Sequence, residues 1–371
     1  MPFKKIIRKV HLILGLSSGI IVVLLGITGC ILAFEVEIRN ITEPYKFVKE
    51  ESKTYLPPSA LKAIAEKNLA SKKALGVEYP GKGKSAIAAY YDEKNYELVY
   101  INPYSGAVLR HKNMNQDFFR FILDGHYYLW LPEDIGQPIA ASATLIFLVM
   151  MITGLILWWP KNKAARKQRF SIKWDAKWRR KNYDLHNVLG FYVTWIAIFI
   201  SITGLVFGFQ WFAKTVYWVS SGGETMIEHV HPVSDTAKTP AIINIADHLW
   251  QQHRGAVNEN ESLGIYFAAL NTDPVEVVVN HLPGTYYNSD FYHYDQYSGK
   301  ELTATGSYAG KFTDANVADK IVRMNYDMHV GAILGLPGKL LAFFASLIAA
   351  SLPVTGFIIW WGRRKKEANK Q

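Results

Sequence analysis

Hydrophobic and polar positions alternate along this chain on two different scales. Four stretches are almost purely apolar and long enough to cross a bilayer as helices, for which about 20 residues suffice. The stretches between them are polar, and parts of them alternate residue by residue, as half-buried strands do. The pattern therefore predicts four membrane-spanning helices, which cover residues 10–34, 135–159, 183–209 and 340–361.

The second half of the chain repeats the first. His11 is followed by the pair Thr28-Gly29 seventeen residues later, and His186 stands at the same spacing from Thr203-Gly204. The second and fourth apolar stretches end alike, in TGLILWW and TGFIIWW. Because two spans separate the two starts, both halves begin on the same side of the membrane. A pseudo-twofold axis along the membrane normal is expected to relate them.

The polar segments repeat as well. In each, a helical pattern near 61–70 or 240–252 precedes runs such as AIAAYY and VEVVVN, which are typical of strands. A turn then follows, NPYSG in the first segment and DQYSG in the second. The sequence therefore predicts two small α+β domains.

These patterns divide the chain into eight expected parts. They are an N-terminus with the first span (1–36), a first α+β domain (37–116), a histidine-bearing segment with the second span (117–160), a basic loop (161–182), the third span (183–213), a second α+β domain (214–320), a histidine-bearing segment with the fourth span (321–362) and a basic tail (363–371).

Positive charge gathers beside the spans. The net charge is +10, with four Lys and Arg in residues 1–9, ten in 160–181 and five in the tail. By the positive-inside rule these segments face the cytoplasm, which places both α+β domains in the periplasm. We expect the charge to meet membrane lipid and no nucleic acid. Trp174 and Trp178, four residues apart in the loop, favour a basic helix on the membrane surface.

The cysteine content excludes several kinds of covalent link and cofactor site. The single cysteine, Cys30, excludes an internal disulfide, a cysteine-ligated iron–sulfur cluster and covalent haem attachment through C-x-x-C-H. Residues 27–30 resemble a lipoprotein cleavage box, but the apolar stretch continues to Phe34. That continuation favours an uncleaved first helix.

Four of the eleven histidines stand at matched positions of the two halves. His11 and His186 lie at the cytoplasmic ends of the first and third spans. His126 and His329 lie before the second and fourth spans, each within the pattern R-x3-D-x-H. A single histidine at a helix end is usually an interfacial polar residue, but two matched pairs at two depths favour a function. The axis is expected to bring His11 opposite His186, and His126 opposite His329.

Two facing histidines suit haem better than zinc. Zinc prefers four ligands, often including cysteine or carboxylate, whereas haem iron needs two axial ligands and accepts neutral imidazoles. Gly15 and Gly190 either leave room for a flat macrocycle or mark a helix crossing. His229 and His231, in the second polar segment, are expected to be solvated loop residues, with external ligation as the alternative.

The chain resembles the PepSY-associated transmembrane family of bacterial inner-membrane proteins. The residues that carry the resemblance are the NPYSG and DQYSG turns, His11 and His186, and the span endings TGLILWW and TGFIIWW. The resemblance implies an α-helical integral membrane protein with four transmembrane helices in two pseudo-symmetric halves and two periplasmic α+β PepSY-like domains.

Members of this family look like iron-uptake proteins, some of them haem-containing ferric-siderophore reductases. By that resemblance, two haem b groups are expected, with their iron bound by His11, His126, His186 and His329. The expected function is then that of an oxidoreductase. It would transfer electrons across the bacterial inner membrane and reduce a ferric siderophore in the periplasm.

The electron donor and two other function classes stay open. The sequence has no nucleotide- or flavin-binding signature, so the donor is expected to be a quinol or a cytoplasmic reductase. One alternative is a PepSY-type binding or regulatory membrane protein without redox activity. The other is a transporter, which is disfavoured because the first, second and fourth spans contain no acidic residue.

Overall fold

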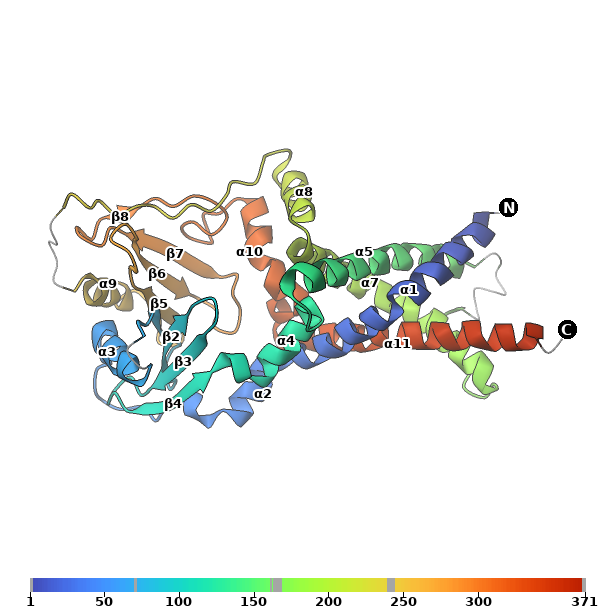
Figure 1. The fold of residues 1–371 in the computed structure, drawn as a ribbon, viewed down its shortest axis with the longest axis horizontal. Coiled ribbons are helices and arrows are strands. Elements are labelled where there is room, and N and C mark those ends of the chain that lie inside the picture. Colours follow the sequence, from blue (N-terminus) through green and yellow to red (C-terminus); the bar gives the residue numbers. More distant parts are fainter. Residues whose placement is uncertain (1–2, 70–71, 161, 163–168, 239–243, 369–371) are drawn as a thin grey trace. The chain divides into compact units, whose positions relative to one another are not determined.

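A computed structural model of the chain describes residues 3–69, 72–160, 162, 169–238 and 244–368. It divides the chain into two compact units, each assembled from both halves of the sequence (Figure 1). The membrane unit comprises Met1–Glu35, Phe121–Ala213 and Asp327–Gln371. The sheet unit comprises Val36–Arg120 and Lys214–Tyr326.

Four helices of the membrane unit are long and apolar enough to cross a membrane, as the hydrophobic pattern predicted. They are α1 (Phe3–Ala33), α5 (Glu133–Trp158), α7 (Trp178–Gly208) and α11 (Gly335–Ala368). Both α1 and α7 pack against α5 and against α11, so the helices form a closed ring with α1 and α7 on one diagonal. At Gly26 of α1 an added Cβ would lie 2.8 Å from Ala350 Cβ, which shows how closely α1 and α11 cross.

The other described helices are shorter and connect the spans and the strands. They are α2 (Glu35–Thr42), α3 (Pro58–Asn68), α4 (Phe118–Tyr128), α8 (Gln210–Ser221), α9 (Ile245–Arg254) and α10 (Val317–His329), with single 3-10 turns at Pro44–Lys46, Met114–Gln116 and Ala332–Leu334. Helix α4 runs through Gly125, and the backbone turns only at Leu129 and Trp130, both with positive φ. The Trp130 ring lies over Gly125, because an added Cβ there would be 2.2 Å from Trp130 Cζ2.

The prediction of a basic surface helix around Trp174 and Trp178 is wrong for the described part of the loop. Residues 170–177 form bends and turns, and Trp178 is the first residue of α7. Asp184, which is buried, accepts hydrogen bonds from the Lys173 backbone N–H and from the Arg180 guanidinium. These bonds fold the loop back against the start of α7 and leave no room for a continuous helix.

The sheet unit is built on one antiparallel sheet of eight strands in the order β4-β3-β2-β1-β5-β6-β7-β8 (Figure 1). The strands are β1 (Gly76–Tyr79), β2 (Ala86–Tyr91), β3 (Tyr96–Ile101), β4 (Val108–Asn113), β5 (Ser262–Tyr266), β6 (Val275–Asn280), β7 (Ser289–Tyr294) and β8 (Glu301–Leu302). Each half of the chain supplies four of them. The two segments predicted as α+β domains therefore share a single sheet, joined where β1 pairs with β5.

Alternation of side chains explains the core of this unit. Along β6, Val275, Val277 and Val279 are buried while the residues between them are half-buried, as a period of two requires. Helices α3 and α9 pack together and against the sheet, with Leu61 and Leu249 fully buried. The apolar faces of both repeats thus meet in one core, which lies between these two helices and the strands.

The repeated turns have the same construction. Asn102 Oδ1 accepts a hydrogen bond from the Tyr104 backbone N–H, and Asp295 Oδ1 accepts one from Ser298 N–H. Gly106 and Gly299 close the turns with φ of 75° and 70°, values that favour glycine. The internal repeat seen in the sequence is therefore a repeat of structure.

Candidate functional site

Each of the four matched histidines lies against a threonine of a neighbouring element in the membrane unit. In every case the Nδ1 atom of the imidazole is within hydrogen-bond distance of the threonine hydroxyl oxygen. The Nδ1–Oγ1 distances are 2.9 Å for His11 and Thr153, 2.8 Å for His126 and Thr28, 2.9 Å for His186 and Thr355, and 3.0 Å for His329 and Thr203.

The glycine that follows each threonine accommodates the imidazole ring. An added Cβ at Gly204 would lie 3.2 Å from His329 Cε1, and one at Gly356 would lie 3.2 Å from His186 Cε1. The corresponding distances are 3.4 Å for Gly29 and His126, and 3.5 Å for Gly154 and His11. A Thr-Gly pair is therefore a seat for a histidine. The threonine holds Nδ1 and the glycine lets the ring approach the helix.

The partners of Nδ1 fix which ring nitrogen carries the proton. His186 Nδ1 lies 3.1 Å from the Leu352 carbonyl oxygen, and His329 Nδ1 lies 3.1 Å from the Ile200 carbonyl oxygen. A carbonyl oxygen only accepts hydrogen bonds, so these Nδ1 atoms must be donors. The Nε2 atoms of His186 and His329 then keep their lone pairs.

The threonine hydroxyls lead to the same conclusion for His11 and His126. Thr153 donates to the Val149 carbonyl and Thr28 to the Leu24 carbonyl, one turn earlier in their own helices. Each hydroxyl has one hydrogen and has already used it, so its oxygen accepts from His11 or His126. All four imidazoles are thus oriented as metal-ligating histidines usually are, with Nδ1–H bonded to the protein and Nε2 available.

His126 and His329 face each other. Their ring centroids are 6.2 Å apart and their planes are inclined by 63°. A metal ion bound by both Nε2 atoms at about 2 Å from each would separate the rings by a similar amount. The predicted pairing of these two histidines is therefore the arrangement that the structure has.

His11 and His186 stand on the diagonal helices α1 and α7. The two histidine pairs occupy different levels of the bundle, because His11 and the residue that holds His126, Thr28, are seventeen residues apart on α1. At 1.5 Å per residue the levels are about 25 Å apart along the helix axis. That separation approaches the thickness of a bilayer core.

Gly15 and Gly190 are at helix crossings. An added Cβ at Gly15 would lie 2.9 Å from Met150 Cε, and one at Gly190 would lie 3.6 Å from Leu352 Cδ2. The space beside both glycines is filled by these side chains. Of the two interpretations that the sequence allowed, the helix crossing is therefore the one that the structure supports.

The role of the Thr-Gly pairs was not recognised from the sequence. The signal was present, because the pair occurs in each of the four spans, at 28–29, 153–154, 203–204 and 355–356. Four seats match four histidines. The sequence shows the repeat but does not indicate which histidine each pair would meet.

The fold and the site together define a class of protein. It is a four-helix membrane protein with two repeated halves, in which each half seats two histidines at two levels of the bundle. The chain belongs to the family described as the PepSY-associated TM region, whose match covers residues 8–363, nearly the whole chain. A search among curated proteins finds no match to it.

Proposed function

We propose that this protein is a transmembrane electron conduit that holds two haem b groups and reduces a ferric siderophore, or a similar ferric chelate, for iron uptake. His11 and His186 would bind one haem iron, and His126 and His329 the other. The observation that carries the proposal is the shared geometry of the four imidazoles. Each has Nδ1 bonded to a threonine and Nε2 available.

The set of donors suits haem. Each site offers two neutral imidazoles, and the residues that orient them are threonines and backbone carbonyls rather than carboxylates. Bound there, haem iron would supply one-electron transfer. The residues of the chain hold the ligand nitrogens at fixed positions and seat them within an apolar bundle. Rigidly positioned ligands would lower the reorganisation energy that accompanies a change in the charge of the haem iron. A low reorganisation energy favours electron transfer over ligand exchange.

The direction of transfer follows from the distribution of Lys and Arg beside the spans. With both termini in the cytoplasm of a bacterial inner membrane, the level of His11 and His186 would receive electrons from a quinol or a cytoplasmic reductase. The level of His126 and His329 would deliver them on the periplasmic side. Reduction of Fe³⁺ to Fe²⁺ by outer-sphere transfer needs no general acid and no nucleophile. The sheet unit, built from the PepSY-like repeats, would then be periplasmic.

Reporter fusions are expected to bear out this orientation. A reporter joined after Gln371 should report a cytoplasmic location. A reporter inserted near Asn258 should report a periplasmic location. The reason is the excess of Lys and Arg in the N-terminal flank, the 160–181 loop and the tail. A periplasmic signal from a reporter within the 160–181 loop would reverse the proposed direction.

Stopped-flow mixing tests the reductase activity itself. Purified protein reduced with dithionite should show the absorbance of reduced haem, and mixing with a ferric siderophore should reoxidise it. A His329→Ala variant should reoxidise more slowly, because one of the two ligands nearest the proposed acceptor is missing. If purified protein is colourless, or if no ferric chelate reoxidises wild type faster than the variant, a PepSY-type binding or regulatory role would replace the reductase proposal.

A further inference from the structure

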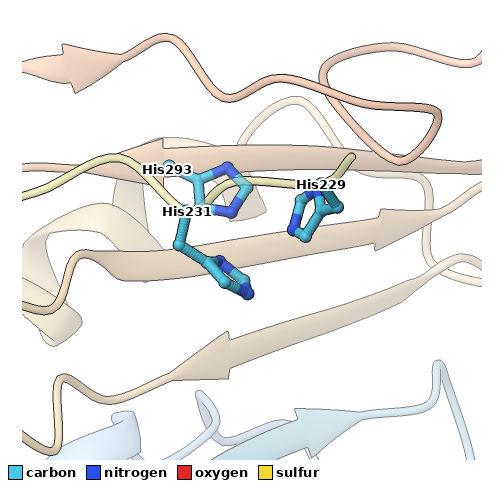
Figure 2. Close-up of side chains that lie close together, drawn as sticks. All are labelled: His229, His231 and His293. Carbon is cyan, nitrogen blue, oxygen red and sulfur yellow. The ribbon is translucent and has the colours of Figure 1, made fainter. Parts of the chain in front are cut away.

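Three other histidines gather in the sheet unit, far in sequence from the four already described. His229 and His231 lie on an extended segment between α8 and α9, and His293 lies on β7 (Figure 2). One ligand nitrogen from each lies within 4.8 Å of the others. Their ring centroids are 4.5 Å, 5.5 Å and 6.2 Å apart.

The segment that carries His229 and His231 is fixed to the sheet unit on both sides of the histidines. Val230 bridges to Thr305, and Gly306, with φ of 90°, lets the backbone of His229 approach closely. Downstream, the backbone N–H of Asp235 donates to the Asp295 carboxylate. Residues i and i+2 of an extended segment point to the same side, so the two imidazoles are presented together.

His229 and His293 each have a ring nitrogen that a metal ion could use. His229 Nδ1 lies 2.9 Å from the Thr305 carbonyl oxygen, so Nδ1 donates and Nε2 keeps its lone pair. His293 is 1% exposed, and its Nε2 is a buried atom without a hydrogen-bond partner among the described residues. A buried nitrogen without a partner costs free energy, which a bound ion would recover.

A carboxylate completes the surroundings. Glu276 pairs with His293 across β6 and β7, and its Oε1 lies 3.9 Å from His293 Nε2. Zinc and related ions take three or four such ligands, with about 2 Å between metal and nitrogen. A shared ion needs a modest closure of the three nitrogens, which the exposed His231 side chain supplies by rotation.

We propose that His229, His231 and His293 bind one divalent transition-metal ion of the class of Zn²⁺, Cu²⁺, Ni²⁺ and Fe²⁺, with Glu276 as the neighbouring carboxylate. Imidazole nitrogen suits these ions, whereas Mg²⁺ and Ca²⁺ prefer oxygen. The ion would join the segment before α9 to β7. This site does not depend on haem or on the electron-transfer proposal, since it lies wholly within the sheet unit.

Calorimetric titration of the full chain with Zn²⁺ tests the site. The protein is purified in detergent, freed of any polyhistidine tag and stripped of metal. Wild type should bind one Zn²⁺ per chain with high affinity and should not bind Mg²⁺. His231→Ala, a change at an exposed residue, should weaken Zn²⁺ binding by about 100-fold or more, since even residues behind the ligands contribute 10–100-fold.

His248→Ala is the matched control, because His248 is an exposed histidine on α9 in the same unit. It should bind Zn²⁺ as wild type does. The thermal unfolding temperature of wild type, but not of His231→Ala, should rise with Zn²⁺. Failure of wild type to bind Zn²⁺, or equal binding by the His229→Ala/His231→Ala double variant, would overturn the proposal.

Discussion

If the protein holds the two haem groups proposed above, replacing His329 by alanine should halve the haem content of the purified protein. The imidazole of His329 faces that of His126 at a ring separation of 6.2 Å, and a haem at that level would keep only one of its two axial ligands. The pair His11 and His186 is about 25 Å away along the bundle, so its haem should remain. Extracted haem per chain and the reduced-minus-oxidised spectrum measure the change.

Further variants test which residues bind the proposed haem at each level of the bundle. His186→Ala should remove the other haem, and His111→Ala, a change at an exposed histidine of β4, should remove neither. Thr203→Val keeps the shape of the side chain but removes the oxygen that accepts from His329 Nδ1. Loss of such a partner typically weakens metal binding by about 10–100-fold. Full haem content in both His186→Ala and His329→Ala would show that these histidines are not the ligands.

Replacing Arg323 by methionine is expected to destabilise the sheet unit by about 3 kcal/mol or more. The Arg323 side chain, on α10, is 2% exposed and donates to the backbone carbonyls of Ser307, Ala309 and Ser289. Each buried carbonyl left without a donor costs about 1–3 kcal/mol. Burial lowers the pKa of Arg323, and the nearby carboxylates of Asp319 and Asp290 oppose that shift.

Thermal unfolding followed by tryptophan fluorescence measures this effect. For a unit of this size, a loss of 3 kcal/mol corresponds to a fall of about 10 °C in the unfolding temperature. Lys320→Met, on the same helix, removes a single exposed bond to the Thr313 carbonyl and should cost about 1 kcal/mol or less. Equal unfolding temperatures for the two variants would mean that the carbonyls around Arg323 find other donors.

Much of the membrane unit could be predicted because its signals are local. Runs of apolar residues predict spans directly, and the spacing from His11 to Thr28 recurs from His186 to Thr203. The pairing of His126 with His329 followed from that symmetry alone. The threonine seats could not be assigned, because which Thr-Gly pair meets which histidine depends on how the four helices pack.

Local sequence patterns predict less of the sheet unit. Alternation predicted strands such as β2 and β6, but it holds no information on which strand from one half pairs with which from the other. The pairing of Val77 with Ile265 joins segments that two membrane spans, α5 and α7, separate in the sequence. His293 likewise gave no signal beside His229 and His231, because the segment that brings them together is irregular.

The pairing of β1 with β5 also sets an order of events during synthesis. Strand β1 is synthesised before β5, and the edge of β1 that pairs with β5 has no partner until α5, α7 and then β5 itself have been made. During that interval, β1 is an open edge with unpaired N–H and C=O groups, the kind of edge that attracts other chains. The unfinished chain is therefore exposed to wrong strand pairing at β1, and the finished protein is not.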